Sequence, residues 1–302
     1  MRQAGRYLPS YQALRKRYSL KTLFTTKELI EEVTLLPIDA LDPDAAILFS
    51  DITIIALSLG LDLDFVEGVG PVIHPKICTE KDLDSLAYPY LEMPFLEEAI
   101  ASLKKRLKAP LIGFCAAPFT AACYFAEKKL LYKDPAVFSR LLRKITDCTK
   151  WYLQMQIDQG VDAVQIFDSS AYLLPKEQFK TYSLPYISEL LRYVDTRNIP
   201  SIVFARGSCV YKQELIDLHP RAISFDWHEP LSDLRRFVPS SMAVQGNFDP
   251  DLLYAKEELI AEQIHKHLPQ KPGIIVNLGH GLKPDMDPGK VKAFVDIIKS
   301  YG

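Results

Sequence analysis

Two arginines stand four residues apart at the start of the sequence, and their type and spacing suit the binding of an anion. Arg2 and Arg6 flank Gly5, which lets the backbone come close to a ligand. Planar guanidinium groups bind carboxylates and phosphates through two parallel hydrogen bonds, which the ammonium group of lysine cannot form. These residues therefore indicate a site for a polycarboxylate or a phosphate. Two surface arginines on a frayed, solvated terminus are the alternative that the same residues leave open.

A second group of polar residues follows directly after short apolar runs. This group comprises Ser50 and Asp51, residues 118–124, residues 168–170, Arg206 and Gly207, residues 226–228, Asn247, and residues 279–281. Asp51 is the best single candidate for a central catalytic group, although an aspartate in such a place also serves as a turn or helix-capping residue. His280 lies between two glycines, so the backbone can turn sharply there and expose the imidazole.

Short apolar runs alternate with amphipathic stretches along the whole chain. The runs 45–49, 111–116, 163–167, 201–205, 222–225, 243–245 and 273–276 predict strands, and the stretches 26–36, 94–107, 135–159, 176–194, 252–268 and 288–298 predict helices. This alternation is typical of parallel strands covered by helices. No linker or low-complexity segment divides the chain, which predicts one domain over residues 1–302.

Two α/β architectures fit this alternation, a (β/α)₈ barrel and an open doubly wound sheet. The open sheet would normally carry a glycine-rich phosphate turn after an early strand, and the sequence has none. We therefore expect the barrel, with the second group of polar residues around the mouth formed by the carboxyl ends of the strands. Seven strands are one too few to close it. Residues 1–4 precede a polar turn as the later strands do, so we expect a truncated first strand there and an open seam between the strands near Asp51 and His280.

The composition indicates which class of partner and which cellular compartment to expect. The chain has 302 residues, of which 48% are hydrophobic and 25% charged, so we expect a large core. Its net charge is −2, so we do not expect it to bind nucleic acid. Five cysteines are scattered without metal-ligand or paired spacing, which indicates a reduced, cytoplasmic protein. The uncharged run 109–126 is broken by Pro110, Gly113 and Pro118, and it predicts a buried strand and a helix rather than a membrane span.

Four stretches together carry a family resemblance. MRQAGRYLP at 1–9, DAAILFSDI at 44–52, GNFDP at 246–250 and NLGHGLKPDMDP at 277–288 resemble the uroporphyrinogen decarboxylase family, in the same order from end to end. The resemblance implies a (β/α)₈ barrel and a homodimer. It also implies a lyase of porphyrin and haem biosynthesis that removes the four acetate carboxyl groups of uroporphyrinogen to give coproporphyrinogen, with no cofactor and no metal.

The resemblance also implies roles for individual residues. Asp51 would accept hydrogen bonds from the central pyrrole N–H groups and offset developing positive charge, and Arg2 and Arg6 would hold carboxylates, one of them delivering a proton to the ring. Arg15 matches a further family arginine and would bind a more distant carboxylate. The other substrate-binding positions are Gln3 and Ala4 through their backbone, the hydroxyls of Tyr124 and Ser169, and the imidazole of His280.

The chain departs from the family pattern in three places. Family members carry a leader with a helix and most of the first strand before the arginine motif, whereas the sequence here starts at that motif. A glycine-rich stretch usually follows the position of Tyr124, where this chain has AEKKL at 126–130, and Arg206 stands where lysine is expected. These differences affect the support of Arg2 and the shape of one wall of the cleft.

Two other functions remain as alternatives. A zinc-dependent corrinoid or thiol methyltransferase of the same superfamily would share the barrel but needs a zinc thiolate site with His-x-Cys spacing, which does not occur here. The closely spaced pair His265 and His267 does not replace it, because residues two apart on a helix do not face one another. A non-catalytic tetrapyrrole-binding protein would keep the arginines and could dispense with Asp51.

Overall fold

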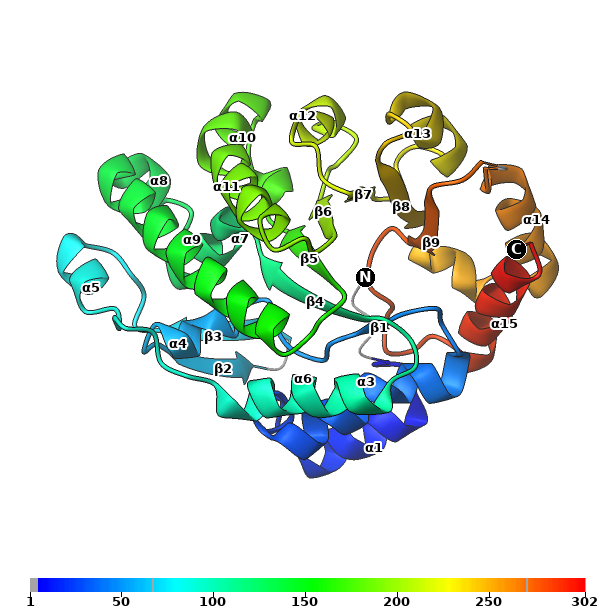
Figure 1. Ribbon diagram of the computed structural model, residues 1–302, viewed down its shortest axis with the longest axis horizontal. Helices are drawn as coiled ribbons and strands as arrows, with labels where there is room; N and C mark the ends of the chain where they lie inside the picture. The colour runs from blue at the N-terminus through cyan, green and yellow to red at the C-terminus, as the bar shows by residue number, and fades with distance from the viewer. Residues whose placement is uncertain (1–4, 67, 270, 302) are drawn as a thin grey trace.

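A curled sheet of seven parallel strands forms the centre of the protein. The computed structural model describes residues 5–66, 68–269 and 271–301. The strands are, in spatial order, β1 (Ala46–Ile47), β4 (Leu111–Ala116), β5 (Ala163–Asp168), β6 (Ser201–Ala205), β7 (Ala222–Ser224), β8 (Ala243–Phe248) and β9 (Ile274–Leu278). Figure 1 shows them in an arc with the helices on its outer side. All seven predicted strands are confirmed, with ends that differ by no more than three residues.

The strands are nearly continuous apolar runs because both faces of the sheet are covered. The register pairs Phe167 of β5 with Phe204 of β6. Inside the arc, the ring of Phe167 makes edge contacts with the rings of Phe114 and Phe204, at centroid distances of 5.6 and 6.1 Å. These aromatic side chains fill the interior of the sheet and form the floor below the carboxyl ends of β4, β5 and β6.

Helices pack against the outer face of the sheet (Figure 1). They are α3 (Lys27–Leu41), α6 (Pro94–Arg106), α9 (Pro135–Asp158), α10 (Lys176–Tyr182), α11 (Leu184–Asp195), α12 (Lys212–Asp217), α13 (Leu231–Phe237), α14 (Glu257–His267) and α15 (Pro288–Lys299). Three predicted helices need correction. The helix predicted to end at residue 36 continues through Pro37, the stretch 176–194 is two helices divided at Ser183, and the stretch 252–268 starts as the 3₁₀ helix η2 (Pro250–Tyr254).

Further elements precede α3 or lie in the loops between strands. They are α1 (Pro9–Arg17), α2 (Leu20–Thr25), α4 (Ile55–Ser58), β2 (Asp62–Val66), β3 (Gly70–His74), α5 (Glu80–Asp84), α7 (Pro118–Phe125), α8 (Leu130–Lys133) and η1 (Ala171–Leu173). The antiparallel hairpin of β2 and β3 was not predicted from the sequence. Strand β4 followed by α7 confirms the interpretation of the uncharged run 109–126. No helix in the described part of the chain has the length and apolar character needed to cross a membrane.

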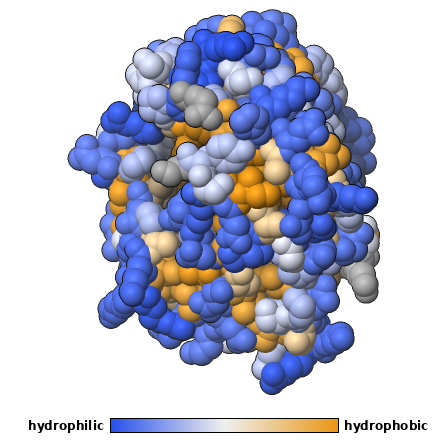
Figure 2. All heavy atoms as spheres, turned by 90° about the vertical axis from the view of Figure 1, so that its right-hand side faces the viewer, coloured by the Kyte–Doolittle hydropathy of each residue, from blue (hydrophilic) through white to orange (hydrophobic). Residues whose placement is uncertain are grey.

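An open seam separates the two edge strands of the sheet. No strand pairing joins β1 to β9 among the described residues, as expected. A groove of about 760 Å³ runs along this seam, and its walls include Ile38 of α3, Ile47, Val276 and Phe294 of α15. Figure 2 shows the side of the molecule that carries α14 and α15, where apolar patches lie between hydrophilic residues. The predicted first strand lies at residues 1–4, outside the described residues.

Candidate active site

Asp51 lies four residues beyond β1, in a turn that fixes one of its carboxylate oxygens. The backbone N–H and the hydroxyl of Thr53 both donate to Oδ1, at 2.9 and 2.6 Å. Among the described residues, no hydrogen bond reaches Oδ2. Asp51 is therefore a turn residue whose second oxygen is not engaged by the described part of the chain, so the two interpretations of its sequence position are compatible.

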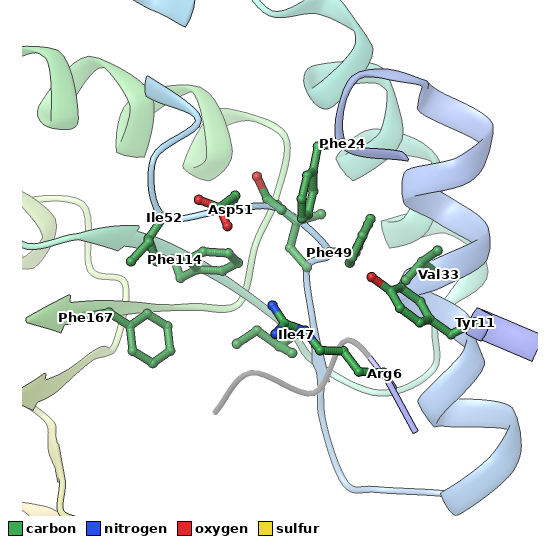
Figure 3. Close-up of a pocket in the computed structure, with 12 residues that line it drawn as sticks. Arg6, Tyr11, Phe24, Val33, Ile47, Phe49, Asp51, Ile52, Phe114 and Phe167 are labelled. Carbon is green, nitrogen blue, oxygen red and sulfur yellow. The ribbon is translucent and has the colours of Figure 1, made fainter. Parts of the chain in front are cut away.

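A small hollow lies beside Asp51 at the mouth of the sheet. Its volume is about 40 Å³, room for roughly two or three water molecules. Arg6 and Tyr11 line it together with Phe24, Val33, Ile47, Leu48, Phe49, Ser50, Ile52, Phe114 and Phe167. Figure 3 shows the Arg6 side chain extending toward Ile47, with Asp51 close to Phe114. Because the hollow is small, a large ligand would have to lie across the mouth and present only one group to Asp51.

Arg6 contributes a positive charge to the lining of this hollow. Its side chain is exposed, and within the described ranges it forms no ion pair. Burial raises the pKa of Tyr11, and the positive charges of Arg6 and Arg15 oppose that rise. The hollow thus combines one cation and one carboxylate with aromatic walls. Such walls exclude water, which strengthens the interaction of both charges with a bound ligand.

A buried carboxylate, Asp168, ties together two segments that carry predicted site residues. Its side chain is fully buried at the end of β5. The hydroxyl of Thr120 in α7 donates to Oδ1 at 2.6 Å, the hydroxyl of Ser183 donates to Oδ2, and the backbone N–H of Ser170 donates to Thr120 Oγ1 at 2.9 Å. Burial raises the pKa of Asp168 to about 6, and the two hydroxyl donors oppose the rise.

This network holds the backbone on both sides of Ser169, which is half-buried. Tyr124 lies one turn after Thr120 in α7, and its carbonyl accepts a 2.6 Å hydrogen bond from Lys76 Nζ. Asp168 therefore connects the segments of two predicted substrate-binding hydroxyls. The sequence had placed residues 168–170 at the mouth but gave no signal that Asp168 is buried.

The loops after β7 and β9 meet at another part of the mouth. His280 is half-buried, and its ring lies edge-on to the indole of Trp227 at 6.2 Å and 81°. A Cβ atom on Gly279 would lie 2.7 Å from the Trp227 backbone nitrogen, so only glycine allows this close packing. The glycine before His280 thus serves close contact with Trp227, whereas its backbone lies outside the positive-φ region, so the turn itself does not require glycine.

The remaining predicted residues are placed differently. Arg15 is half-buried in the last turn of α1, where Nη1 donates to the carbonyl of Tyr18 at 2.7 Å, and it is not among the residues that line the hollow. Arg2, Gln3 and Ala4 lie outside the described residues. Within the described part of the chain, no three His, Cys, Asp or Glu side chains are grouped so that they could hold a metal ion.

The fold and the mouth residues define an α/β enzyme of the (β/α)₈-barrel type, with its polar groups at the carboxyl ends of parallel strands. A methyltransferase from Methanosarcina mazei has a similar fold, with a TM-score of 0.82 over 94% of this chain and 88% of that chain, at 18% identity. A B12-independent methionine synthase from Shewanella sp. W3-18-1 aligns with a TM-score of 0.63 at 12% identity, over 94% of this chain and 91% of that chain.

Sequence comparison gives the family. The family model for uroporphyrinogen decarboxylase (URO-D) matches residues 1–301. Uroporphyrinogen decarboxylase from Protochlamydia amoebophila is 44% identical over 99% of this chain and 86% of its own length, and that from Geobacter sp. (strain M21) is 40% identical over 99% and 92%. The chain belongs to the uroporphyrinogen decarboxylase family, which confirms the resemblance seen in its motifs.

Proposed function

We propose that this chain is a carboxy-lyase that converts uroporphyrinogen to coproporphyrinogen by removing its four acetate carboxyl groups. The observation that carries the proposal is the setting of Asp51, whose Oδ1 is held by Thr53 and whose Oδ2 accepts no hydrogen bond among the described residues. A fixed carboxylate between aromatic walls can accept hydrogen bonds from pyrrole N–H groups and offset positive charge on the macrocycle. Curated relatives of that name, similar over the full chain, support the same activity.

The chemistry requires a proton on a pyrrole ring, which makes the substrate its own electron sink. The bond from the methylene carbon to the carboxylate then breaks, its electron pair flows into the cationic ring, and carbon dioxide leaves. The methylene carbon next takes up a proton to become a methyl group, and the ring returns to its neutral form by losing the first proton. Asp51 stabilises the ring in its cationic forms before and after the loss of carbon dioxide. Because the ring itself takes up the electron pair, the reaction needs neither a metal nor an organic cofactor.

The other predicted residues hold the substrate. Arg6 lies beside Asp51 and would bind a carboxylate, and Arg2 would share this role and the delivery of the ring proton. The hydroxyls of Tyr124 and Ser169 approach acid groups near the end of β5, and His280 binds another near the end of β9. Arg15 serves a more distant carboxylate, and Gln3 and Ala4 contribute backbone groups.

Anaerobic incubation of the purified protein with uroporphyrinogen, followed by chromatography of the oxidised products, tests the activity. We expect intermediates with seven, six and five carboxyl groups and then coproporphyrinogen, with a rate that chelator treatment leaves unchanged. Absence of products with fewer carboxyl groups would contradict the proposal. Activity that is lost with a chelator and restored by zinc would favour the methyltransferase alternative, which the fold likeness to a methyltransferase at 18% identity does not support by itself.

We further propose that residues 1–302 act as one barrel domain in a cytoplasmic homodimer. The cysteines at 78, 115, 123, 148 and 209 are free thiols, which suits a reducing compartment. Size-exclusion chromatography with light scattering tests the dimer, and a molar mass of one chain would contradict it.

A further inference from the structure

Asp226, two residues after β7, is a buried carboxylate with four donors around it. Asp226 is only 1% exposed to solvent. The backbone N–H groups of Gly207 and Ser208 donate to Oδ2, at 2.7 and 3.2 Å. His228 Nδ1 lies 2.9 Å from Oδ1, and the thiol of Cys209 lies 3.6 Å from the same oxygen. The carboxylate is thus held rigidly, and one of its oxygens fixes an imidazole.

His228 is exposed although its ring is held from two sides. Its side chain is 62% exposed, and its ring stacks on the indole of Trp227 with centroids 5.4 Å apart and planes 17° apart. Because Nδ1 faces Asp226, Nδ1 carries the proton and Nε2 lies on the other side of the ring, away from the carboxylate. A surface histidine would normally sample several rotamers, whereas this one presents Nε2 in a single direction. That preorganisation lowers the entropy cost of binding an anion.

Three rings from two loops form one packed group, which we name the β7–β9 ring cluster: Trp227, His228 and His280. Trp227 stacks on His228 and meets His280 edge-on. Gly279 allows the two loops to pack closely, since any side chain there would collide with Trp227. The cluster therefore brings a second imidazole into contact with the same indole as His280, a predicted substrate-binding residue.

The position of the cluster relative to Asp51 follows from the order of strands. β7 is the fourth strand along from β1 in the sheet. In a barrel with eight strand positions, a fourth neighbour stands opposite, so residues after β7 face residues after β1 across the mouth. Figure 1 shows β7 and β1 on different arms of the arc. A ligand centred on Asp51 and held by Arg6 would have its far side over the β7–β9 ring cluster.

We propose that His228 is a specificity-determining residue that binds a peripheral carboxylate of the tetrapyrrole, with Asp226 as its positioning residue. This inference rests on the proposed function. The imidazolium form of His228 would donate from Nδ1 to Asp226 and from Nε2 to a carboxylate of the ligand. The neighbouring Glu229 is paired with Lys212 at 2.7 Å. Its negative charge is therefore balanced and adds little repulsion toward a carboxylate near the ring of His228.

Steady-state kinetics of single variants test the role of His228. Losing a charge-assisted hydrogen bond at an exposed site should raise KM for uroporphyrinogen about tenfold in His228→Ala, with kcat within about twofold of the wild type. His228→Gln, which keeps one donor without charge, should show a smaller rise. His265→Ala removes an exposed histidine on α14 and serves as the matched control. Equal KM values in His228→Ala and His265→Ala would overturn the proposal, as would a fall in kcat at unchanged KM.

Asp226 is tested by the same measurement in two backgrounds. Asp226→Asn should raise KM in the wild-type background but cause little further rise in His228→Ala, because the carboxylate acts through the imidazole. A purely structural role would lower stability in both backgrounds without this dependence. Equal increases of KM in the two backgrounds would overturn the positioning role, and His228→Ala keeps the main proposal testable if Asp226→Asn fails to fold.

Product inhibition identifies which carboxylate is bound. Coproporphyrinogen retains only propionate groups, so a weaker inhibition of His228→Ala by coproporphyrinogen assigns the contact to a propionate. Unchanged inhibition, together with a raised KM for uroporphyrinogen, assigns it to an acetate. A wild-type chain that releases no coproporphyrinogen overturns the proposed function and this inference together, whereas an active enzyme with unchanged KM in His228→Ala overturns only the inference.

Discussion

Replacing Asp168 by asparagine should make the protein more stable near neutral pH. Burial raises the pKa of Asp168 from 3.8 to about 6 in the folded chain. Between these two values the unfolded chain has lost a proton that the folded chain still holds, so the free energy of unfolding falls as the pH rises. At about 1.4 kcal/mol for each pKa unit, the full loss is about 3 kcal/mol, of which about 2 kcal/mol falls between pH 4.5 and 7.5. Asparagine has the shape of the protonated acid and does not titrate.

Urea unfolding of wild type and Asp168→Asn at half-unit steps from pH 4.5 to 7.5 measures this effect. The stability of the variant relative to wild type should increase by about 2 kcal/mol across the range and level off above about pH 7. Asp39→Asn, at an exposed aspartate, is the control and should show no such trend. A constant difference between Asp168→Asn and wild type at every pH would refute the reasoning, because it would mean that the carboxylate is not desolvated.

Two further substitutions test contacts at the mouth. Thr53→Val removes the hydroxyl that holds Asp51 Oδ1 and should lower kcat about tenfold. Thr53→Ser keeps a hydroxyl and should retain most activity. Equal kcat in both variants would show that the hydroxyl does not matter. Gly279→Ala places a Cβ atom 2.7 Å from the Trp227 backbone nitrogen and should lower the free energy of unfolding by about 1–3 kcal/mol, measured by thermal unfolding. Gly289→Ala, whose Cβ would meet a side-chain oxygen at 3.2 Å, should lower it less. The opposite order would contradict the packing argument.

The strands were predictable because helices cover the sheet, which makes strands such as β4 and β6 uninterrupted apolar runs. The hairpin of β2 and β3 was not predictable, because polar residues, glycine and proline interrupt the apolar pattern of both strands, at Asp62, Asp64, Gly70 and Pro71. Each of the two strands is stabilised by pairing with the other. Likewise, the helical period continues through residues 176–194, so periodicity alone does not reveal that Ser183 divides the stretch into two helices.

The site was predictable only in part. Asp51, His280 and the segments 118–124 and 168–170 were predicted because they follow apolar runs, whereas the hydroxyl roles of Tyr124 and Ser169 came from the family resemblance. The burial of Asp168 depends on Thr120 and Ser183, which are 48 and 15 residues away, and no local pattern records that contact. The pairing of His228 with Asp226 was equally hidden, because it depends on the course of a loop rather than on a helical or strand period.

Steady-state kinetics of Asp51→Asn with uroporphyrinogen under anaerobic conditions test the central claim most directly. An amide can still meet pyrrole N–H groups but cannot offset a positive charge that develops in the transition state, and losing such stabilisation costs about 2.7–4 kcal/mol. We predict a kcat that is about 10²–10³ lower, with KM changed by no more than about threefold. A kcat near that of the wild type, or a loss confined to KM, would contradict the role assigned to Asp51.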